Sequence, residues 1–271
     1  MSAKSRSGSV GQLVFAAVAL MIFGFLLLPL IIIIGVSFND ASALSFPPKG
    51  ITLKWYKEFL SDASYIASIV HSTQLALVAT FFGLVLGVCA ASALSQAQFR
   101  GAATLKAIFM SPLVVPHLVI GVALLQFAAS LGIARNFYVL LGGHIVLVLP
   151  YIIRMVLGAY MGFDRRLVAA SQDLGAASLT TFRLITLPLI KPSIIASGLF
   201  AFVISWTNIE LSIFNTSAQY TLLPLKIFNY VLYTVDPIIA AVSASTVYLA
   251  ILAVVLIDRL VGIDSFASMR S

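Results

Sequence analysis

The sequence places several ionisable side chains within long apolar stretches, among them His117, His144, Arg154 and Glu210. An ionisable group in hydrocarbon costs several kcal/mol unless it faces protein or a water-filled cavity, so each of these residues is a candidate for function. The sequence contains no P-loop, zinc-protease or serine-hydrolase motif, and we expect neither a catalytic residue nor a metal site. These side chains therefore suggest the passage of a polar solute.

Glu210 lies deep in its apolar stretch and has polar neighbours. On one continuous helix, positions 207 and 210 share a face, as do positions 208 and 212, and such a face suits the lining of a pathway. The alternative is a position near the outer surface, where water reaches the carboxylate. The candidate pathway residues are His117, His144, Trp206, Thr207, Asn208 and Glu210.

His144 is the expected partner of Glu210. At about 1.5 Å per residue, the two lie at a similar depth in their helices. Arg154 lies nearer the cytoplasmic end of its helix, so its head group can extend to the interface.

His117 directly follows a proline pair, Pro112 and Pro116. These prolines are expected to bend the helix and to free carbonyl groups that face a cavity. A lone histidine in a helix bundle is also often a satisfied packing residue. A packing role therefore stays open for His117 and His144.

The composition requires that these residues sit on membrane helices. Hydrophobic residues make up 61% of the 271 residues and charged residues only 9%, against about 25% charged in a soluble domain. The net charge of +7 is spread thinly, which makes nucleic acid an improbable partner. The single Cys89 cannot form an intrachain disulfide and has no metal-ligand spacing beside it.

The apolar stretches predict an all-α membrane protein with six transmembrane helices in a single domain over residues 1–271. A spanning helix needs about 20 apolar residues, and these stretches are too long and continuous for barrel strands. The first one is also longer than a signal-peptide core, so we interpret it as an uncleaved helix. The expected spans are residues 13–36, 66–94, 107–133, 137–163, 193–216 and 238–260.

The distribution of Lys and Arg predicts that both termini are cytoplasmic, because the segments on that side then carry the excess of basic residues. Small-residue pairs, Gly83 with Gly87 and Gly158 with Gly162, have the spacing that permits close helix approach. We expect both pairs to serve packing within the subunit.

Residues 164–191, between the fourth and fifth spans, are too long for a structureless connection. Asp164 can cap a first helix that Gly175 ends in the left-handed conformation. Ser178 can cap a second, ended by Leu187-Pro188. Both helices carry an apolar stripe. This stripe packs either on the chain's own helices or in another protein.

Residues 168–175 read Val-Ala-Ala-Ser-Gln-Asp-Leu-Gly, and residues 184–188 read Leu-Ile-Thr-Leu-Pro. This pattern resembles the "EAA" loop of permease subunits of bacterial ATP-binding-cassette (ABC) importers. Six helices with this loop between the fourth and fifth are similar to the type I importer permease fold. The resemblance implies a cytoplasmic coupling helix that sits in a cleft of the ATPase subunit. The residues that it assigns to ATPase coupling are Ala169, Ala170, Asp173, Gly175, Phe182, Leu187 and Pro188.

The chain departs from the family pattern at Ala169, which stands where the motif usually has a glutamate. The ionic contact of that glutamate with the ATPase cannot form here. Docking then depends on shape and apolar contact, or a sister permease supplies the ionic contact.

The resemblance also implies the partners. A second related permease completes the pathway, two ATPase subunits dock on the coupling loops, and an extracytoplasmic solute-binding protein delivers the solute. The ATPase uses ATP and Mg, and this chain binds no cofactor. The expected location is the bacterial inner membrane. Whether the permease pair is a homodimer or a heterodimer stays open.

Residues 46–50, 111–116 and 223–227 resemble the second permease subunit of spermidine/putrescine-type importers. In that branch the positions matching His117, Thr207 and Asn208 are often acidic, whereas here none is. A charge argument then favours a zwitterion or a single amine, such as an opine or aminobutyrate, over a long polyamine. Lineage and pathway chemistry disagree, so the solute stays open.

Two other classes of function compete with an importer permease. A self-contained secondary transporter or channel would use residues 164–191 only for internal packing, but no inverted repeat is detectable. An assembly scaffold would tolerate apolar residues at Asn208 and Glu210.

Overall fold

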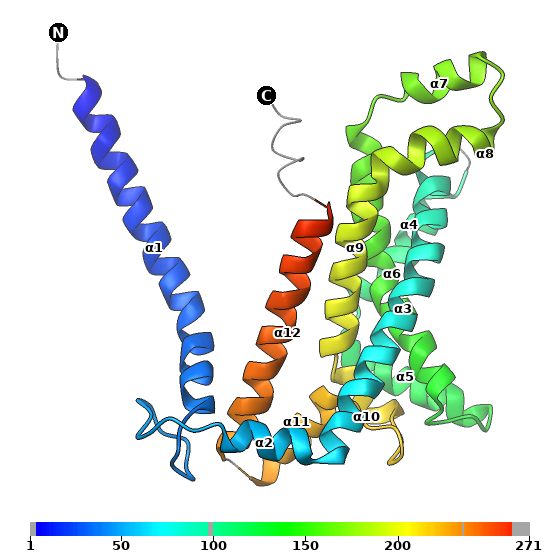
Figure 1. Ribbon diagram of the computed structural model, residues 1–271. Coiled ribbons are helices and arrows are strands. Elements are labelled where there is room, and N and C mark those ends of the chain that lie inside the picture. Colours follow the sequence, from blue (N-terminus) through cyan, green and yellow to red (C-terminus); the bar gives the residue numbers. More distant parts are fainter. Residues whose placement is uncertain (1–3, 97–99, 235, 262–271) are drawn as a thin grey trace. The chain divides into compact units, whose positions relative to one another are not determined.

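The computed structural model describes residues 4–96, 100–234 and 236–261, and its regular elements are all helices (Figure 1). Isolated bridges join Asn39 to Ile51 and Ser217 to Tyr220. The all-α prediction is thus confirmed for the described part of the chain. The elements are α1 (Lys4–Ser37), α2 (Lys54–Ser61), α3 (Ala63–Ser95), α4 (Ala102–Met110), η1 (Ser111–Leu113), α5 (His117–Ser130), α6 (Phe137–Gly162), α7 (Arg166–Asp173), α8 (Ser178–Thr181), η2 (Phe182–Thr186), α9 (Leu187–Thr207), α10 (Glu210–Asn215), α11 (Leu223–Tyr233) and α12 (Pro237–Val261).

Four described helical segments are long and apolar enough to cross a bilayer, and a bent pair makes a fifth when it counts as one span. The apolar part of α12, Pro237–Leu252, is shorter than these. Several long apolar spans are therefore confirmed, whereas the count of six stays a prediction. The four segments are Gly11–Ser37, Ala63–Ser95, Phe137–Gly162 and Ser178–Thr207.

The bent pair lies where the sequence predicts a bend. Residues 102–113 and 117–130 meet at an angle of 100°. Pro116 has no N–H to donate and holds an extended backbone (φ −54°, ψ 131°), and α5 begins directly after it. A proline disfavours a helical conformation in the residue before it, so the helical segment 102–113 ends before α5 begins. The predicted bend of the third span is confirmed.

The described residues pack as two compact units, one containing residues 4–63 and 229–258 and the other residues 64–228. In the first unit, the buried Asn39 organises the connection between α1 and α2. Its carbonyl accepts a hydrogen bond from Trp55 Nε1 (2.8 Å), and its side-chain Oδ1 accepts one from the N–H of Lys49 (3.0 Å). The prediction of a single domain over residues 1–271 stays a prediction.

In the second unit, α6 is the central helix and packs on α3 and α9. Added Cβ atoms at Gly83 and Gly87 would lie 2.8 Å from Val148 and 2.6 Å from Ile152, so these glycines allow α3 to approach α6 closely. Their predicted packing role is confirmed.

The second glycine pair does not serve internal packing. A Cβ at Gly158 or at Gly162 would meet nothing within 4 Å, and both residues are exposed on α6. The prediction for this pair is wrong, because α3 and α9 cover a different face of the helix.

Candidate functional site

A helix, a glycine turn and a second helix follow α6. Asp164 Oδ1 accepts a hydrogen bond from the N–H of Arg166 (2.9 Å) just before α7, whose N-cap residue is Arg165. The helix ends in a Schellman motif, in which the N–H groups of Gly175 and Ala176 close onto carbonyls of its last turn. Gly175 has φ +84°, a left-handed conformation that favours glycine. The predicted stop at Gly175 is confirmed, whereas the N-cap of the helix is Arg165 and not Asp164 as predicted.

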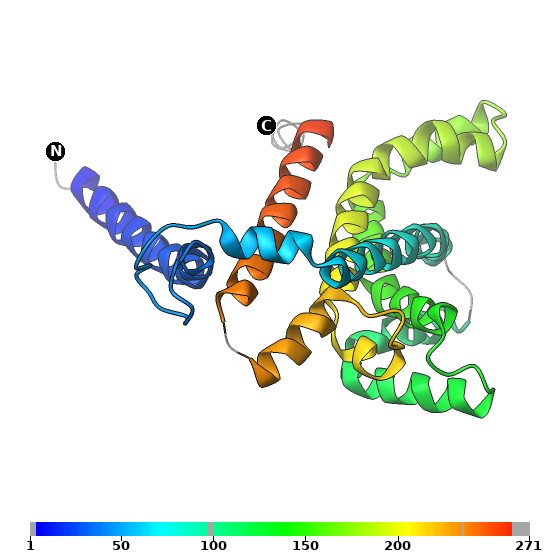
Figure 2. The same ribbon diagram turned by 60° about the horizontal axis from the view of Figure 1, so that its bottom comes forward.

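Large apolar side chains on this element are not covered by the chain. Leu167, Leu174 and Leu179 are exposed to 49%, 90% and 59%. Figures 1 and 2 show that α7 and α8 extend beyond the ends of α6 and α9. An exposed apolar surface of this kind is typical of a site that binds another protein. It disfavours the alternative in which the stripe packs only on the chain's own helices.

The second helix of the segment does not end at the proline. α8 continues through the π-helical turn η2 into α9, so residues 178–207 form one helical segment. The wider turn ends at Thr186, two residues before Pro188, which donates no backbone hydrogen bond. The helix continues through this proline, so the predicted end at Leu187-Pro188 is wrong. The predicted cap is also wrong, because Ser178 is the first helical residue and Ala177 is the N-cap.

The predicted coupling residues all lie on or beside this helix–turn–helix element, and their role in coupling stays a prediction. A hydrogen bond of 3.0 Å between Ser171 Oγ and Thr181 Oγ1 ties α7 to α8. Ala169, Ala170, Asp173, Gly175, Leu187 and Pro188 are exposed, and Phe182 is half-buried.

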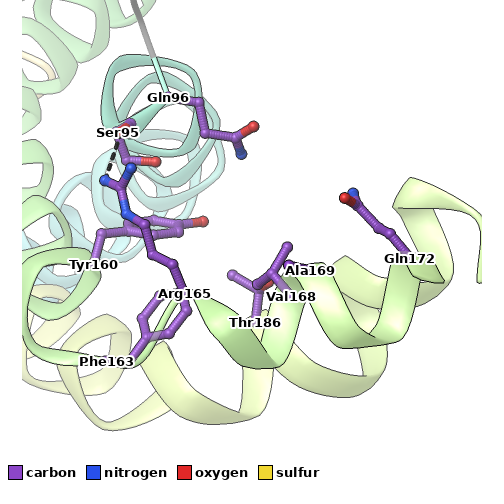
Figure 3. A pocket seen from close by; sticks show the side chains of 9 residues that line it. All are labelled: Ser95, Gln96, Tyr160, Phe163, Arg165, Val168, Ala169, Gln172 and Thr186. Atoms are coloured by element: carbon purple, nitrogen blue, oxygen red, sulfur yellow. Dashed lines mark hydrogen bonds between the residues drawn. The ribbon is translucent and has the colours of Figure 1, made fainter. Parts of the chain in front are cut away.

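A groove of about 650 Å³ lies between α7 and the ends of α3 and α6 (Figure 3). Ala169 lines it together with Val168, so the small side chain at the motif's glutamate position opens onto a hollow. Arg165 Nη2 donates a hydrogen bond to the carbonyl of Ser95 (2.8 Å) and connects the start of α7 to the end of α3.

The second candidate region is a break in the apolar stretch 193–216. α9 ends at Thr207, the backbone is extended at Asn208 (φ −70°, ψ 124°), and α10 begins at Glu210. Asn208 Oδ1 accepts a hydrogen bond from the N–H of Leu211 (3.0 Å). The prediction of one continuous helix here is wrong, because this side chain replaces a helical backbone hydrogen bond with its own.

The carboxylate of Glu210 is exposed at the start of α10. Asn208 Nδ2 donates a hydrogen bond to its Oε2 (2.8 Å), and no hydrogen bond to Oε1 occurs among the described residues. The carboxyl end of α9 lies beside it and carries the negative end of a helix dipole. Together these groups suit a cation such as an alkylammonium group.

The expected pair between His144 and Glu210 does not form. His144 is fully buried, and its Nδ1 lies 2.8 Å from Ser205 Oγ, whereas Nε2 has no hydrogen-bond partner. Glu210 follows the break at Asn208 and is exposed, whereas His144 is buried. The pair was predicted from residue counting along a straight helix, which the break invalidates.

The other predicted pathway residues have different surroundings. Trp206 is buried and donates a hydrogen bond from Nε1 to Thr73 Oγ1 (3.3 Å). Thr207 is exposed and donates to the carbonyl of Val203 (2.8 Å). His117 is half-buried at the start of α5.

Sequence reasoning missed the contact that holds the two broken spans together. Asn215 Nδ2 donates a hydrogen bond to the carbonyl of Gly121 (2.9 Å), which joins α10 to α5. A Cβ at Gly121 would lie 2.8 Å from the carbonyl oxygen of Glu210. A buried amide in an apolar stretch, such as that of Asn215, is the signal that could have indicated this contact.

Comparisons with known proteins decide the family. No protein-family model matches the chain. The chain is 32% identical to the spermidine/putrescine transport system permease protein PotC of Escherichia coli. The match extends over 246 residues, which are 91% of this chain and 93% of the relative. It is 30% identical over 233 residues to the putrescine transport system permease protein PotI of the same species, which covers 83% of each chain. The chain belongs to the family of spermidine/putrescine-type ABC transporter permeases.

Solved structures agree on the fold of the permease. It superposes with a TM-score of 0.73 and 18% identity on a bacterial ABC transporter involved in the import of the polysaccharide alginate, over 97% of this chain and 99% of that one. The inward-facing methionine transporter MetNI matches with a TM-score of 0.61 and 20% identity, over 72% of this chain and 94% of that one. The permease is therefore a multi-pass subunit of an ABC importer in the inner membrane.

Proposed function

We propose that this permease carries a small organic amine across the inner membrane and that a separate ATPase docks on α7 and α8 to drive it. The observation that carries this proposal is that the exposed helix–turn–helix element is continuous with the membrane helix that ends at the polar break. Residues 178–207 form one helical segment, and Leu174 beside it is 90% exposed.

A continuous helix suits the transmission of movement. Residues 178–207 span roughly 45 Å at 1.5 Å per residue. A displacement of α8 by the ATPase then moves the end of α9 at Thr207 without an intervening loop. The bundle alternates between outward and inward openings because packed helices have discrete arrangements.

The solute is proposed to carry a positive charge. The relatives at 30–32% identity are named for spermidine and putrescine, both of which are polyamines. Glu210 offers one exposed carboxylate beside the end of α9. Because His117, Thr207 and Asn208 are not acidic, a solute with a single amine, such as an opine or aminobutyrate, is the second candidate.

The architecture of the complete transporter follows the family. We propose six spans with both termini cytoplasmic, a second related permease, two ATPase subunits and an extracytoplasmic binding protein. One of the similar structures, at a TM-score of 0.72 and 15% identity, is an alginate transporter in complex with its periplasmic protein. The ATPase subunits, and not this permease, bind ATP and Mg.

Reconstitution tests the proposal against the rival class of secondary transporter. Proteoliposomes that contain this permease, its sister permease and the ATPase are expected to take up labelled putrescine or spermidine only when ATP is present on the ATPase side. Unlabelled aminobutyrate serves as the competitor that reports the second solute candidate. Uptake by the permease alone under an ion gradient would contradict the proposal.

A further inference from the structure

The groove under α7 has the donors of an anion site. Its lining residues include one basic residue and no Asp or Glu. Figure 3 shows that Gln172 on α7 and Gln96 at the end of α3 lie on opposite sides of the hollow. The polar side chains in the lining are Ser95, Gln96, Tyr160, Arg165, Gln172 and Thr186.

Arg165 retains donors that the fold does not use. Its Nη2 donates one hydrogen bond to Ser95 O (2.8 Å), and a guanidinium carries five N–H donors. Among the described residues, Arg165 forms no ion pair with a carboxylate within 4.0 Å. The preceding residue, Asp164, accepts a hydrogen bond from the N–H of Arg166 and is not in the lining. The groove therefore has a positive charge that the described residues do not neutralise.

The position of the groove favours a lipid phosphate as its ligand. Ser95 and Gly162 end the apolar segments of α3 and α6, which places the groove at the level where membrane helices meet the head groups. Basic pockets between membrane helices at this level bind anionic head groups. A volume of about 650 Å³ also accommodates a phosphate together with its ester group.

We propose that this groove binds the phosphate group of an anionic ligand, which in the membrane is the head group of a phospholipid such as phosphatidylglycerol. Arg165 supplies the charge, and the amides of Gln96 and Gln172 supply hydrogen bonds from either side. Gln96 directly follows α3, Arg165 directly precedes α7 and Gln172 lies on α7, so the bound anion links the coupling element to the bundle. The site does not depend on the identity of the transported solute.

Lipid binding by the full-length permease tests the site. The wild type, Arg165→Gln and Arg166→Gln are incorporated into phosphatidylcholine nanodiscs with added phosphatidylglycerol, and retained lipid is measured by native mass spectrometry. Arg165→Gln is expected to bind phosphatidylglycerol about tenfold more weakly, the loss of one charge-assisted hydrogen bond. Arg166→Gln removes the same charge from an exposed neighbour outside the lining and is expected to bind as the wild type does.

Two further variants separate binding from folding. Arg165→Lys keeps the charge and is expected to restore most of the binding. Gln172→Leu leaves the tether from Arg165 to Ser95 intact but removes a donor, so weaker binding by this variant supports the site without disturbing the start of α7.

Inorganic phosphate, titrated against the delipidated permease in a thermal-shift assay, identifies the source of the anion. If phosphate stabilises the wild type but not Arg165→Gln, the site binds a soluble anion. If only the lipid stabilises the permease, the site binds a lipid head group. Equal loss of binding in Arg165→Gln and Arg166→Gln would overturn the proposal. So would unchanged anion binding in Arg165→Gln combined with lost co-purification of the ATPase, because the groove would then be a protein contact.

Discussion

At the scale of single residues, Gly175 is distinguished by its backbone conformation and Glu210 by its charge. Gly175 holds a left-handed backbone with φ +84° and has nothing within 4 Å of an added Cβ. Glu210 presents a carboxylate with one oxygen held by Asn208 and the other without a partner among the described residues. Each can be changed with little effect on the packing around it.

Gly175→Val is expected to leave the permease in the membrane but to reduce the amount of ATPase that co-purifies with it. A β-branched side chain has room at this position, but the left-handed backbone costs it roughly 1–2 kcal/mol, which unwinds the Schellman turn. Gly175→Asn is the control, since asparagine tolerates this conformation. Equal co-purification for wild type and valine variant would show that the turn does not present the docking surface.

Glu210→Gln is expected to raise the KM for uptake of a cationic solute about tenfold, because the variant keeps the shape of the side chain and the hydrogen bond from Asn208 but removes the charge. Uptake assays with the reconstituted transporter measure this change. Thr207→Val changes another exposed candidate pathway residue, one without a charge, and shows whether the effect depends on the charge. An unchanged KM for Glu210→Gln would show that the carboxylate does not contact the solute in the pathway.

At the scale of elements, the two broken spans meet where α5 packs on α10. Gly121 permits this contact, since an added Cβ would lie 2.8 Å from the backbone oxygen of Glu210 and 3.2 Å from the Cα of Leu211. A backbone atom cannot rotate away as a side chain can. The hydrogen bond from Asn215 to Gly121 fixes the same crossing.

Gly121→Ala is therefore expected to separate α5 from α10 and to destabilise the permease by about 1–3 kcal/mol, the usual effect of overpacking. Gly142→Ala is the matched control, because a Cβ there meets nothing within 4 Å. Thermal unfolding in detergent and ATP-driven uptake measure the two consequences. If both variants unfold at the same temperature, the crossing is not closely packed.

At the scale of the whole molecule, the orientation in the membrane determines which end of the bundle the ATPase can reach. The proposed orientation places α7 and α8 on the cytoplasmic side and α2 on the outer side. The chain contains one cysteine, Cys89, so a cysteine-free background needs only a single substitution.

In a Cys89→Ser background, Ser61→Cys on α2 is expected to react with a membrane-impermeant maleimide added to intact cells. Ser178→Cys at the start of α8 is expected to react only after the membrane is permeabilised. Both positions are exposed, so accessibility to the reagent depends on the side of the membrane. The reverse pattern would place the helix–turn–helix element outside, where no ATPase can dock.

The sequence by itself determined the helical class, the long apolar spans, the bend at Pro112 and Pro116, and the turn at Gly175. These features follow from local composition, from the missing N–H of proline and from the left-handed conformation that glycine adopts, none of which requires a distant partner. The resemblance to importer permeases also came from local sequence and is confirmed by relatives over most of the chain.

Only the tertiary structure decided the break at Asn208, the partner of His144, the contact at Gly121 and the open face at Gly158. Each depends on which side chain lies within hydrogen-bond distance or which helix covers a face. Residue spacing along one helix cannot supply this information, because apolar stretches that look alike in sequence pack differently once their neighbours are in place.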